Sequence, residues 1–339
     1  MTIGSGLGAT FGLGLETTVG TFQAPSEFVT VQSAALSLKK TVVQSKVLHG
    51  GLYNLAARRA YTTRTADGQV KLDLYDRSIG NLLKACLGAG SVTANTGYST
   101  MVFTPADLQG LSYSLQVGKP STDGTMHAFS YPGAKVTEWE IAVQVGQQAS
   151  FDVTFDAWDE LTAQTYAAPS YTNGNMLTFA EGTVWLGGTV STVSGVSSIT
   201  GGSKVATCKS ATVQGKNALD VSRFFLGANG LKAEQLANDT REITGNLDIE
   251  FANLTDVYDT FNNNGLETGV ALELKFVGPV ITGTTTSEID ILIPRIYFDE
   301  NPIEVDGPKI LEQKAKFTGL DDGTNNQIQI TYVTADTAL

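Results

Sequence analysis

The chain has 339 residues, of which 42% are hydrophobic and 17% charged; this composition excludes a disordered protein and suffices for two compact domains. Its 34 acidic and 22 basic residues give a formal charge of −12, which argues against a protein that grips nucleic acid by its phosphates. No apolar run of about 18 residues occurs, so we expect no membrane insertion. The 36 glycines and the abundant Val, Thr, Ile and Tyr predict a mainly β protein with many turns.

Residues 1–27 are rich in glycine and in turn-forming residues, and we expect them to form an N-terminal arm. Gly4, Gly6 and Gly8 lack the spacing of a dinucleotide-binding loop, and no predicted strand precedes them. The segment also lacks the basic and apolar blocks of a secretory signal. The beginning of the chain therefore predicts neither a nucleotide cofactor nor export.

The stretch 68–88 predicts a strand that runs into a short helix. Apolar residues alternate from Val70 to Leu74, which is the pattern of a strand with one buried face. Apolar residues then recur at helical spacing. We expect the N-cap of this helix at Asp76 and its C-terminal stop at Gly88.

A second stretch of the same kind occurs at 245–265. Its strand alternates from Leu247 to Phe251, and its helix is expected between Asn253 and Gly265. The bounding glycines and the strand positions of the two stretches match at one constant offset, which takes residue 68 to residue 245. We call this shift the repeat offset. The apolar faces of the two predicted helices match only after one sequence is shifted by one further residue. The sequence therefore contains an internal repeat.

Long connections, at 50–63 and 227–240, precede the two predicted strands at matching offsets. Other alternating segments predict strands at 28–32, 35–46, 110–118, 127–131, 135–145, 149–158, 204–208, 211–221, 270–278, 289–298, 303–305 and 310–319. We predict a tandem duplication with a first domain at 28–160, a linker at 161–203, and a second domain at 204–339. Within the linker, 177–179 and 183–186 are expected to form a short hairpin.

Few residues suggest catalysis. The two histidines, His49 and His127, lie outside any nucleophile or metal-binding motif, and Cys86 belongs to the apolar face of the first predicted helix. Glu138 and Glu140 share one face of a predicted strand, which is typical of a solvated surface. The sequence predicts no enzyme, no metal site and no cofactor.

Three arginines, Arg58, Arg59 and Arg64, gather around the first long connection of this acidic chain. They lack the regular aromatic interleaving of a nucleic-acid-binding surface. Arginine is enriched at protein interfaces, where it pairs with carboxylates of a partner. We therefore expect these arginines to contact another subunit.

Three segments resemble the tail tube (major tail) proteins of long-tailed bacteriophages: GLGLETTVGTFQAP, ALSLKKTVVQSK and TADGQVKLDLYDRSIGNLLKACLG. In that family a β-sandwich with a flanking helix assembles into rings that stack into the hollow tail. The resemblance implies a structural virion protein, made in the host cytoplasm, in which a β-sandwich or half-barrel domain with one short helix occurs twice. With two domains in each chain, it implies a trimeric ring of pseudo-sixfold symmetry lined by a continuous β-barrel.

The resemblance also implies two functional surfaces. The family's loop that contacts the next ring corresponds to the two long connections, which gives four ring-stacking candidates: Arg58, Arg59, Lys232 and Glu234. The channel of the family tends to be electronegative, so that DNA slides without adhering. The candidates for residues that face the lumen are Asp73, Asp248 and Glu250, opposite the apolar faces of the central strands.

The partners that the resemblance implies are other copies of the chain, the tape-measure, terminator and distal tail proteins, and double-stranded DNA that passes without tight binding. A function of another class stays open. A virion adhesin, decoration protein or host-surface binding module would use an exposed aromatic patch, for which Tyr166, Tyr171 and Trp185 are the candidates. An enzyme would need a pocket in which carboxylates converge.

Overall fold

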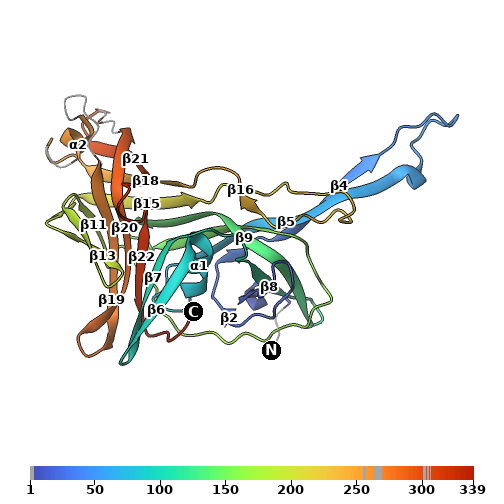
Figure 1. The fold of residues 1–339 in the computed structure, drawn as a ribbon, viewed down its shortest axis with the longest axis horizontal. Coiled ribbons are helices and arrows are strands. Elements are labelled where there is room, and N and C mark those ends of the chain that lie inside the picture. The colour runs from blue at the N-terminus through green and yellow to red at the C-terminus, as the bar shows by residue number, and fades with distance from the viewer. Residues whose placement is uncertain (1–3, 255–256, 263–268, 301–302, 304, 306) are drawn as a thin grey trace.

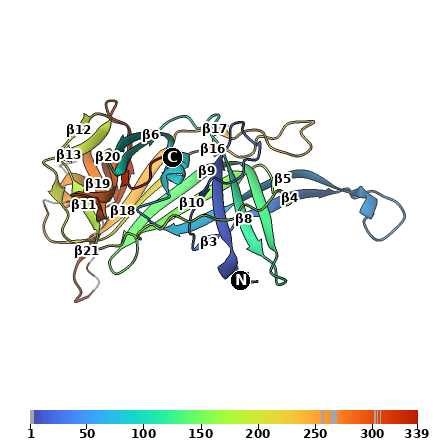
Figure 2. The ribbon, with the colours of Figure 1, turned by 90° about the horizontal axis from the view of Figure 1, so that it is seen from below.

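The computed structural model describes residues 4–254, 257–262, 269–300, 303, 305 and 307–339. The protein is mainly β, with 54% of it in strands, as the sequence predicts. Figure 1 shows an elongated molecule in which the hairpin of β4 (Ser37–Gln44) and β5 (Arg59–Asp73) projects from one end. The helix α2 (Tyr258–Asn262) lies near the other end. Figure 2 shows the molecule from below, with the same hairpin projecting from its end.

The first half of the chain forms β4, β5 and the following further elements: η1 (Gly6–Gly8), β1 (Thr10–Leu15), β2 (Glu27–Phe28), β3 (Ser33–Ala34), η2 (Ala56–Arg58), α1 (Gly80–Leu87), β6 (Gly88–Asn95), β7 (Tyr98–Pro105), β8 (Tyr113–Pro120), β9 (Met126–Gln144) and β10 (Ser150–Ala157). The two strands predicted at 127–131 and 135–145 are thus one strand, β9. Burial is unbroken over residues 130–136, because β9 passes there from its pairing with β8 to its pairing with β10 and is covered on both faces.

The second half forms α2 and these strands: β11 (Gly182–Leu186), β12 (Thr189–Val193), β13 (Val196–Thr200), β14 (Ser203–Lys204), β15 (Cys208–Lys216), β16 (Leu219–Asp220), β17 (Leu236–Ala237), β18 (Glu242–Glu250), β19 (Val270–Thr282), β20 (Thr285–Glu300), β21 (Glu312–Gly319) and β22 (Gln329–Thr334). The segment 161–203 therefore contains β11 and the hairpin of β12 and β13. Leu177 does not form the expected hairpin with β11, because it bonds to the backbone of Leu74 and Ala149 while β11 pairs with β19.

One continuous antiparallel sheet runs through both halves in the order β4, β5, β10, β9, β15, β18, β21, β20. Because side chains alternate along each strand, one face of this central sheet is apolar and the other is polar. The apolar face includes side chains that are at most 1% exposed: Leu72, Phe151, Ile141, Leu247 and Phe317.

A second layer covers the apolar face. The first part of β9 pairs with β8, and β8 pairs with β1, whose Phe11 and Leu13 are buried. In the second half β20 pairs with β19, and β19 pairs with β11. Residues 10–15, which belong to the expected N-terminal arm, are therefore a strand of the core, because their alternating apolar residues complete the layer beside β8.

The strand registers of the first half recur in the second. β3 and β4 pair with β5 in the register that β15 has on β18, shifted by the repeat offset. For example, Ser37 faces Asp67 and Gln214 faces Thr244. The repeat seen in the sequence thus describes the pairing of whole strands.

A β-bulge recurs in a similar way. The pairing of β9 with β10 skips Thr137, and the pairing of β20 with β21 skips Asp299. We call the shift that takes Thr137 to Asp299 the bulge offset. A bulge adds one residue to a strand, which bends the strand locally and increases its twist. Both halves therefore share the same irregularity as well as the same strand order.

The first predicted helix is present but starts differently from the expectation. α1 ends at Gly88, whose φ of 106° suits glycine, as predicted. Its N-cap is Ile79, whose side chain accepts no hydrogen bond from the first backbone N–H groups of the helix. The predicted N-cap, Asp76, instead accepts hydrogen bonds from the backbone and side chain of Asn175, which draws its carboxylate away from the helix.

The second predicted helix starts later than expected. α2 begins at Tyr258, well after the expected N-cap at Asn253, and its expected stop at Gly265 lies outside the described residues. Val257 is buried, whereas Leu254 and Phe261 are 52% and 40% exposed. The described residues therefore do not form a fully packed apolar stripe, from which helices in proteins gain most of their stability.

The hairpin of β6 and β7 was not predicted, and the second half has no equivalent of it among its described residues. β7 pairs with β22, and β22 also pairs with β20. A strand of the second half thus lies between strands of both halves. The two halves are joined here and at the junction of β9 with β15.

Candidate functional surfaces

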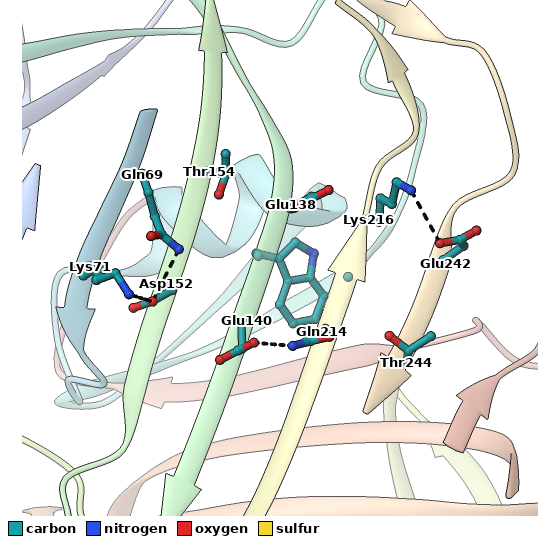
Figure 3. A pocket seen from close by; sticks show the side chains of 12 residues that line it. Gln69, Lys71, Glu138, Glu140, Asp152, Thr154, Gln214, Lys216, Glu242 and Thr244 are labelled. Atoms are coloured by element: carbon teal, nitrogen blue, oxygen red, sulfur yellow. Dashed lines mark hydrogen bonds and ion pairs between the residues drawn. The ribbon is translucent and has the colours of Figure 1, made fainter. Parts of the chain in front are cut away.

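The polar face of the central sheet is the first candidate surface (Figure 3). A shallow groove of about 460 Å³ crosses it over β5, β10, β9, β15 and β18. The charged side chains that line this groove are Lys71, Glu138, Glu140, Asp152, Lys216 and Glu242. Figure 3 shows them standing on adjacent strands, so the surface follows directly from the alternation of polar residues opposite the core.

Five of the described lysines on this face are paired with carboxylates. The pairs are Lys39 with Asp67 at 2.6 Å, Lys71 with Asp152 at 2.9 Å, Lys209 with Glu250 at 2.8 Å and with Glu312 at 2.9 Å, Lys216 with Glu242 at 3.9 Å, and Lys316 with Glu300 at 2.8 Å. Exposed pairs of this kind add little to stability. Their effect here is electrostatic, because each carboxylate neutralises an ammonium group that would otherwise attract an anion.

Additional carboxylates leave the face acidic. Glu138 is exposed, and Glu140 accepts a hydrogen bond from Gln214. This agrees with the interpretation of Glu138 and Glu140 as a solvated face, and the groove that they line is open and shallow.

The three lumen candidates lie opposite the apolar face. Asp73 follows the buried Leu72 and accepts hydrogen bonds from Gln32 and Tyr75. Asp248 accepts a hydrogen bond from Ser210 on the neighbouring strand. Glu250 pairs with Lys209.

The arm, residues 40–63, is the second candidate surface. It comprises most of β4, the start of β5 and the turn between them, and it projects away from the rest of the molecule (Figure 1). Its exposed large apolar residues are Val43, Val47, Leu48, Leu52, Tyr53, Leu55 and Tyr61. Arg58 and Arg59 are exposed on it too. An exposed apolar patch rimmed by cations is typical of a protein interface.

The second-half loop, residues 217–240, is the counterpart of the arm at the repeat offset, but it folds back onto the first half. Lys232 forms an ion pair with Asp156 at 2.6 Å, and the two side chains are only 1% and 8% exposed. Gln235 donates hydrogen bonds to the carbonyl oxygen of Gly133 and to Asp156. The loop is therefore held by buried polar contacts.

A second ion pair fixes the same loop. Lys135, which is buried, pairs with Glu234 at 2.7 Å and also donates to the carbonyl oxygens of Leu108 and Gln235. Burial lowers the pKa of Lys135, and Glu234 opposes this shift. Of the four ring-stacking candidates, Lys232 and Glu234 are thus engaged within the chain, and Arg58 and Arg59 are exposed. Sequence reasoning did not identify Lys135 and Asp156, since their partners lie far away along the chain.

The remaining candidates are scattered. The His49 ring contacts the carbonyl oxygen of Tyr53, and His127 contacts Ser121. Cys86 is buried, as predicted, and burial raises the pKa of its thiol. Arg64 pairs with Asp159 of the same chain at 3.0 Å. Within the described ranges, neither a cluster of three metal-ligating side chains nor a helix able to cross a membrane is found.

The three aromatic residues of the alternative function come from different parts of the molecule. Tyr166 lies against Thr10 of β1, and the ring of Tyr171 meets that of Phe28 edge-on at 6.4 Å. Trp185 lies on β11, which pairs with β19 in the second half. No hydrogen bond or ring contact in the described part of the chain joins Trp185 to the two tyrosines.

Comparison with known proteins points to a family. The family model described as phage tail tube protein matches residues 6–319, which include both halves of the central sheet. No curated protein matches the chain.

Proposed function

The chain belongs to the phage tail tube protein family, and we propose that its copies close into trimeric rings that stack around a channel for DNA. As a member of that family it is a structural, non-enzymatic protein of the virion tail, and tail tube proteins polymerise with themselves. The ring, its symmetry and the channel lining are the parts that we propose. The observation that carries them is the continuous central sheet, which has the same strand order in both halves.

A tandem duplication accounts for this sheet. Each half contributes four neighbouring strands: β4, β5, β10 and β9 in the first, and β15, β18, β21 and β20 in the second. The repeated registers and the repeated bulge support a common origin of the halves. Two similar units in one chain suit a ring in which three chains occupy six equivalent places.

The size of such a ring is adequate for a duplex. Three copies with eight central strands each would form a barrel of 24 strands. With about 4.8 Å between strands, its wall would be roughly 115 Å around and at least about 37 Å across, and tilted strands would widen it. Closing the sheet would also remove its two exposed edges.

The polar face of the central sheet is the proposed lining of the lumen, with Asp73, Asp248 and Glu250 among its residues. Tight binding of DNA requires free cations that replace the counterions of the phosphates. Here the lysines Lys39, Lys71, Lys209, Lys216 and Lys316 have carboxylate partners. A sixth, Lys314, is exposed and lies opposite Asp248 on the neighbouring strand, and further carboxylates such as Glu138 remain. Such a wall would repel the duplex weakly and uniformly, so that DNA passes without adhering.

Contact between rings is proposed to use the arm. Its apolar residues and the cations Arg58 and Arg59 are exposed and would be covered by the next ring. Lys232 and Glu234 would act indirectly, because they hold the second-half loop in place. The tape-measure, terminator and distal tail proteins are the further partners that we propose for such a tube.

The test is electron microscopy of the purified, concentrated protein, combined with its mass in solution. We expect rings of three chains with six similar lobes around a hole, and stacks of such rings. A closed oligomer without a central channel would contradict the proposal and favour the virion adhesin or decoration protein. Rings of six chains would contradict the pseudo-sixfold arrangement.

A further inference from the structure

The junction between the halves within one chain shows how one repeat binds the next. The outer edge of β15 pairs with the last part of β9, so that Lys216 faces Glu138 and Ala211 faces Val143. Val143 is partly buried against the core. The junction thus combines backbone pairing, an apolar contact and two opposite charges on facing strands.

The chain contains the two equivalent edges a second time, without a partner among the described residues. The equivalents of β15 at the repeat offset are β3 and β4, which pair with β5 alone in the described part of the chain. The last part of β9 corresponds, at the bulge offset, to the chain that begins at the end of β20. In the described part of the chain, residues 297–300 at that end pair along one edge only, with β21.

The residue types of the junction recur on these two edges. Lys216 corresponds to Lys39 and Glu138 to Glu300, and the side chains of Lys39 and Glu300 are more than half exposed. Ala211 corresponds to Ala34 and Val143 to Val305. Val305 is 77% exposed, whereas its equivalent packs against the core.

The described residues around Glu300 keep the register of the first half. Ile303 forms a β-bridge with Gln313. These two residues correspond, at the bulge offset, to Ile141 and Phe151, which pair with each other in the first half. Val305 therefore stands at the place that Val143 has in the junction of the first half.

We propose that the outer edge of β3 and β4 in one copy pairs antiparallel with the end of β20, Ile303 and Val305 in a neighbouring copy, so that Lys39 lies opposite Glu300 and Ala34 opposite Val305. This inference rests on the proposed ring and specifies the edges and the register that close it. The two edges lie on different halves, so the contact is head-to-tail and each copy offers one edge of each kind. Lys39 exchanges its partner Asp67, and Glu300 its partner Lys316, for each other at little cost, since both pairs are exposed.

Disulfide trapping tests the register. Facing residues of antiparallel strands have Cα atoms about 4.5–5.5 Å apart, within the range of a disulfide. In a Cys208→Ser background, Lys39→Cys with Glu300→Cys should give covalent dimers and trimers on mild oxidation of assembled protein. The matched control, Lys216→Cys with Glu138→Cys, should cross-link within one chain and leave the mass at that of a monomer. Lys40→Cys with Glu300→Cys shifts the register by one position and should cross-link at least tenfold less.

The outcomes separate the register from the ring. Rings seen by microscopy without cross-linking between 39 and 300, while the in-chain control forms, would overturn the register and leave the proposed function standing. Absence of both rings and cross-links would overturn both. Charge reversal gives a second measurement: Lys39→Glu should reduce assembly, and the double variant Lys39→Glu with Glu300→Lys should restore it. Failure of the double variant to assemble better than either single variant would contradict the pairing of these two residues.

Discussion

The arm and the second-half loop start from equivalent strands, yet they behave in opposite ways. The second-half loop lies on the first half and is fixed by Lys232, Glu234 and Gln235 through buried polar contacts. At the equivalent positions the arm carries Leu55, Ala57 and Arg58, and it projects into solvent. The sequence of the second-half loop is therefore adapted to a neighbour within the same chain, whereas under the proposed ring contact that of the arm would be adapted to a separate copy. Buried charges suit a permanent contact, since they would be costly to leave unpaired at each dissociation.

The largest effect is expected from Lys232→Met. This change leaves Asp156 buried without its cation, which should cost about 3–5 kcal/mol of unfolding free energy. Urea denaturation followed by tryptophan fluorescence measures it. Lys39→Met removes an exposed pair and should cost under about 1 kcal/mol. Equal losses for the two variants would show that the second-half loop is not fixed more firmly than the exposed edge.

A somewhat smaller loss is expected from Gly215→Leu. A Cβ atom at position 215 would come within 2.3 Å of the Trp139 indole, so the junction of β15 with β9 would be overpacked. We expect a loss of about 2–3 kcal/mol. The equivalent position on the outer edge of β4 is already leucine, Leu38, and the reverse change Leu38→Gly should cost less. Thermal unfolding of both variants would settle whether Trp139 is the cause, because Trp139→Ala should relieve the effect of Gly215→Leu.

The halves should also differ in their dependence on pH. Burial raises the pKa of Asp290 on β20 from 3.8 to about 8, and Glu273 adds to the shift. A carboxyl group with a raised pKa in the folded state contributes stability that is full below about pH 4 and lost as the pH rises through about 8. Asp290→Asn should therefore flatten the fall in stability between pH 5 and 8. Its first-half equivalent is Ala128, and Ala128→Ser should leave the pH profile of the melting temperature unchanged.

The smallest effect on the fold is expected from Arg58→Glu with Arg59→Glu. Both side chains are exposed on the arm, so the unfolding free energy should change by less than about 0.5 kcal/mol. Stacking of rings, measured as tube length by electron microscopy, should nevertheless decrease. Lys46→Glu, at another exposed position of the arm, is the control for charge alone. Tubes of normal length would remove these arginines from the proposed ring contact.

The features that could be predicted from the sequence are those set by apolar alternation and by the positions of glycines. The strands β5 and β18, the end of α1 at Gly88 and the repeat offset all rest on local patterns that the structure retains. Sequence reasoning missed β7 and β22, which pair with each other from opposite halves of the chain. It also missed β6, whose residues are partly or fully exposed and show no apolar alternation. It also assigned Lys232 and Glu234 by position in the loop, whereas their partners Asp156 and Lys135 are set by the tertiary fold. The proposed domain boundaries, the ring contacts and the lumen residues stay predictions.

The insertion of β22 between β7 and β20 has a consequence for biosynthesis. Phe103 and Ile330, which face each other across β7 and β22, lie in opposite halves of the chain. While a ribosome is still translating the second half, the edge of β7 that pairs with β22 therefore has no partner. Part of the core of the first half stays exposed during this time. Long-range strand pairing of this kind slows folding. It also couples completion of the early half to synthesis of β22 in the late half.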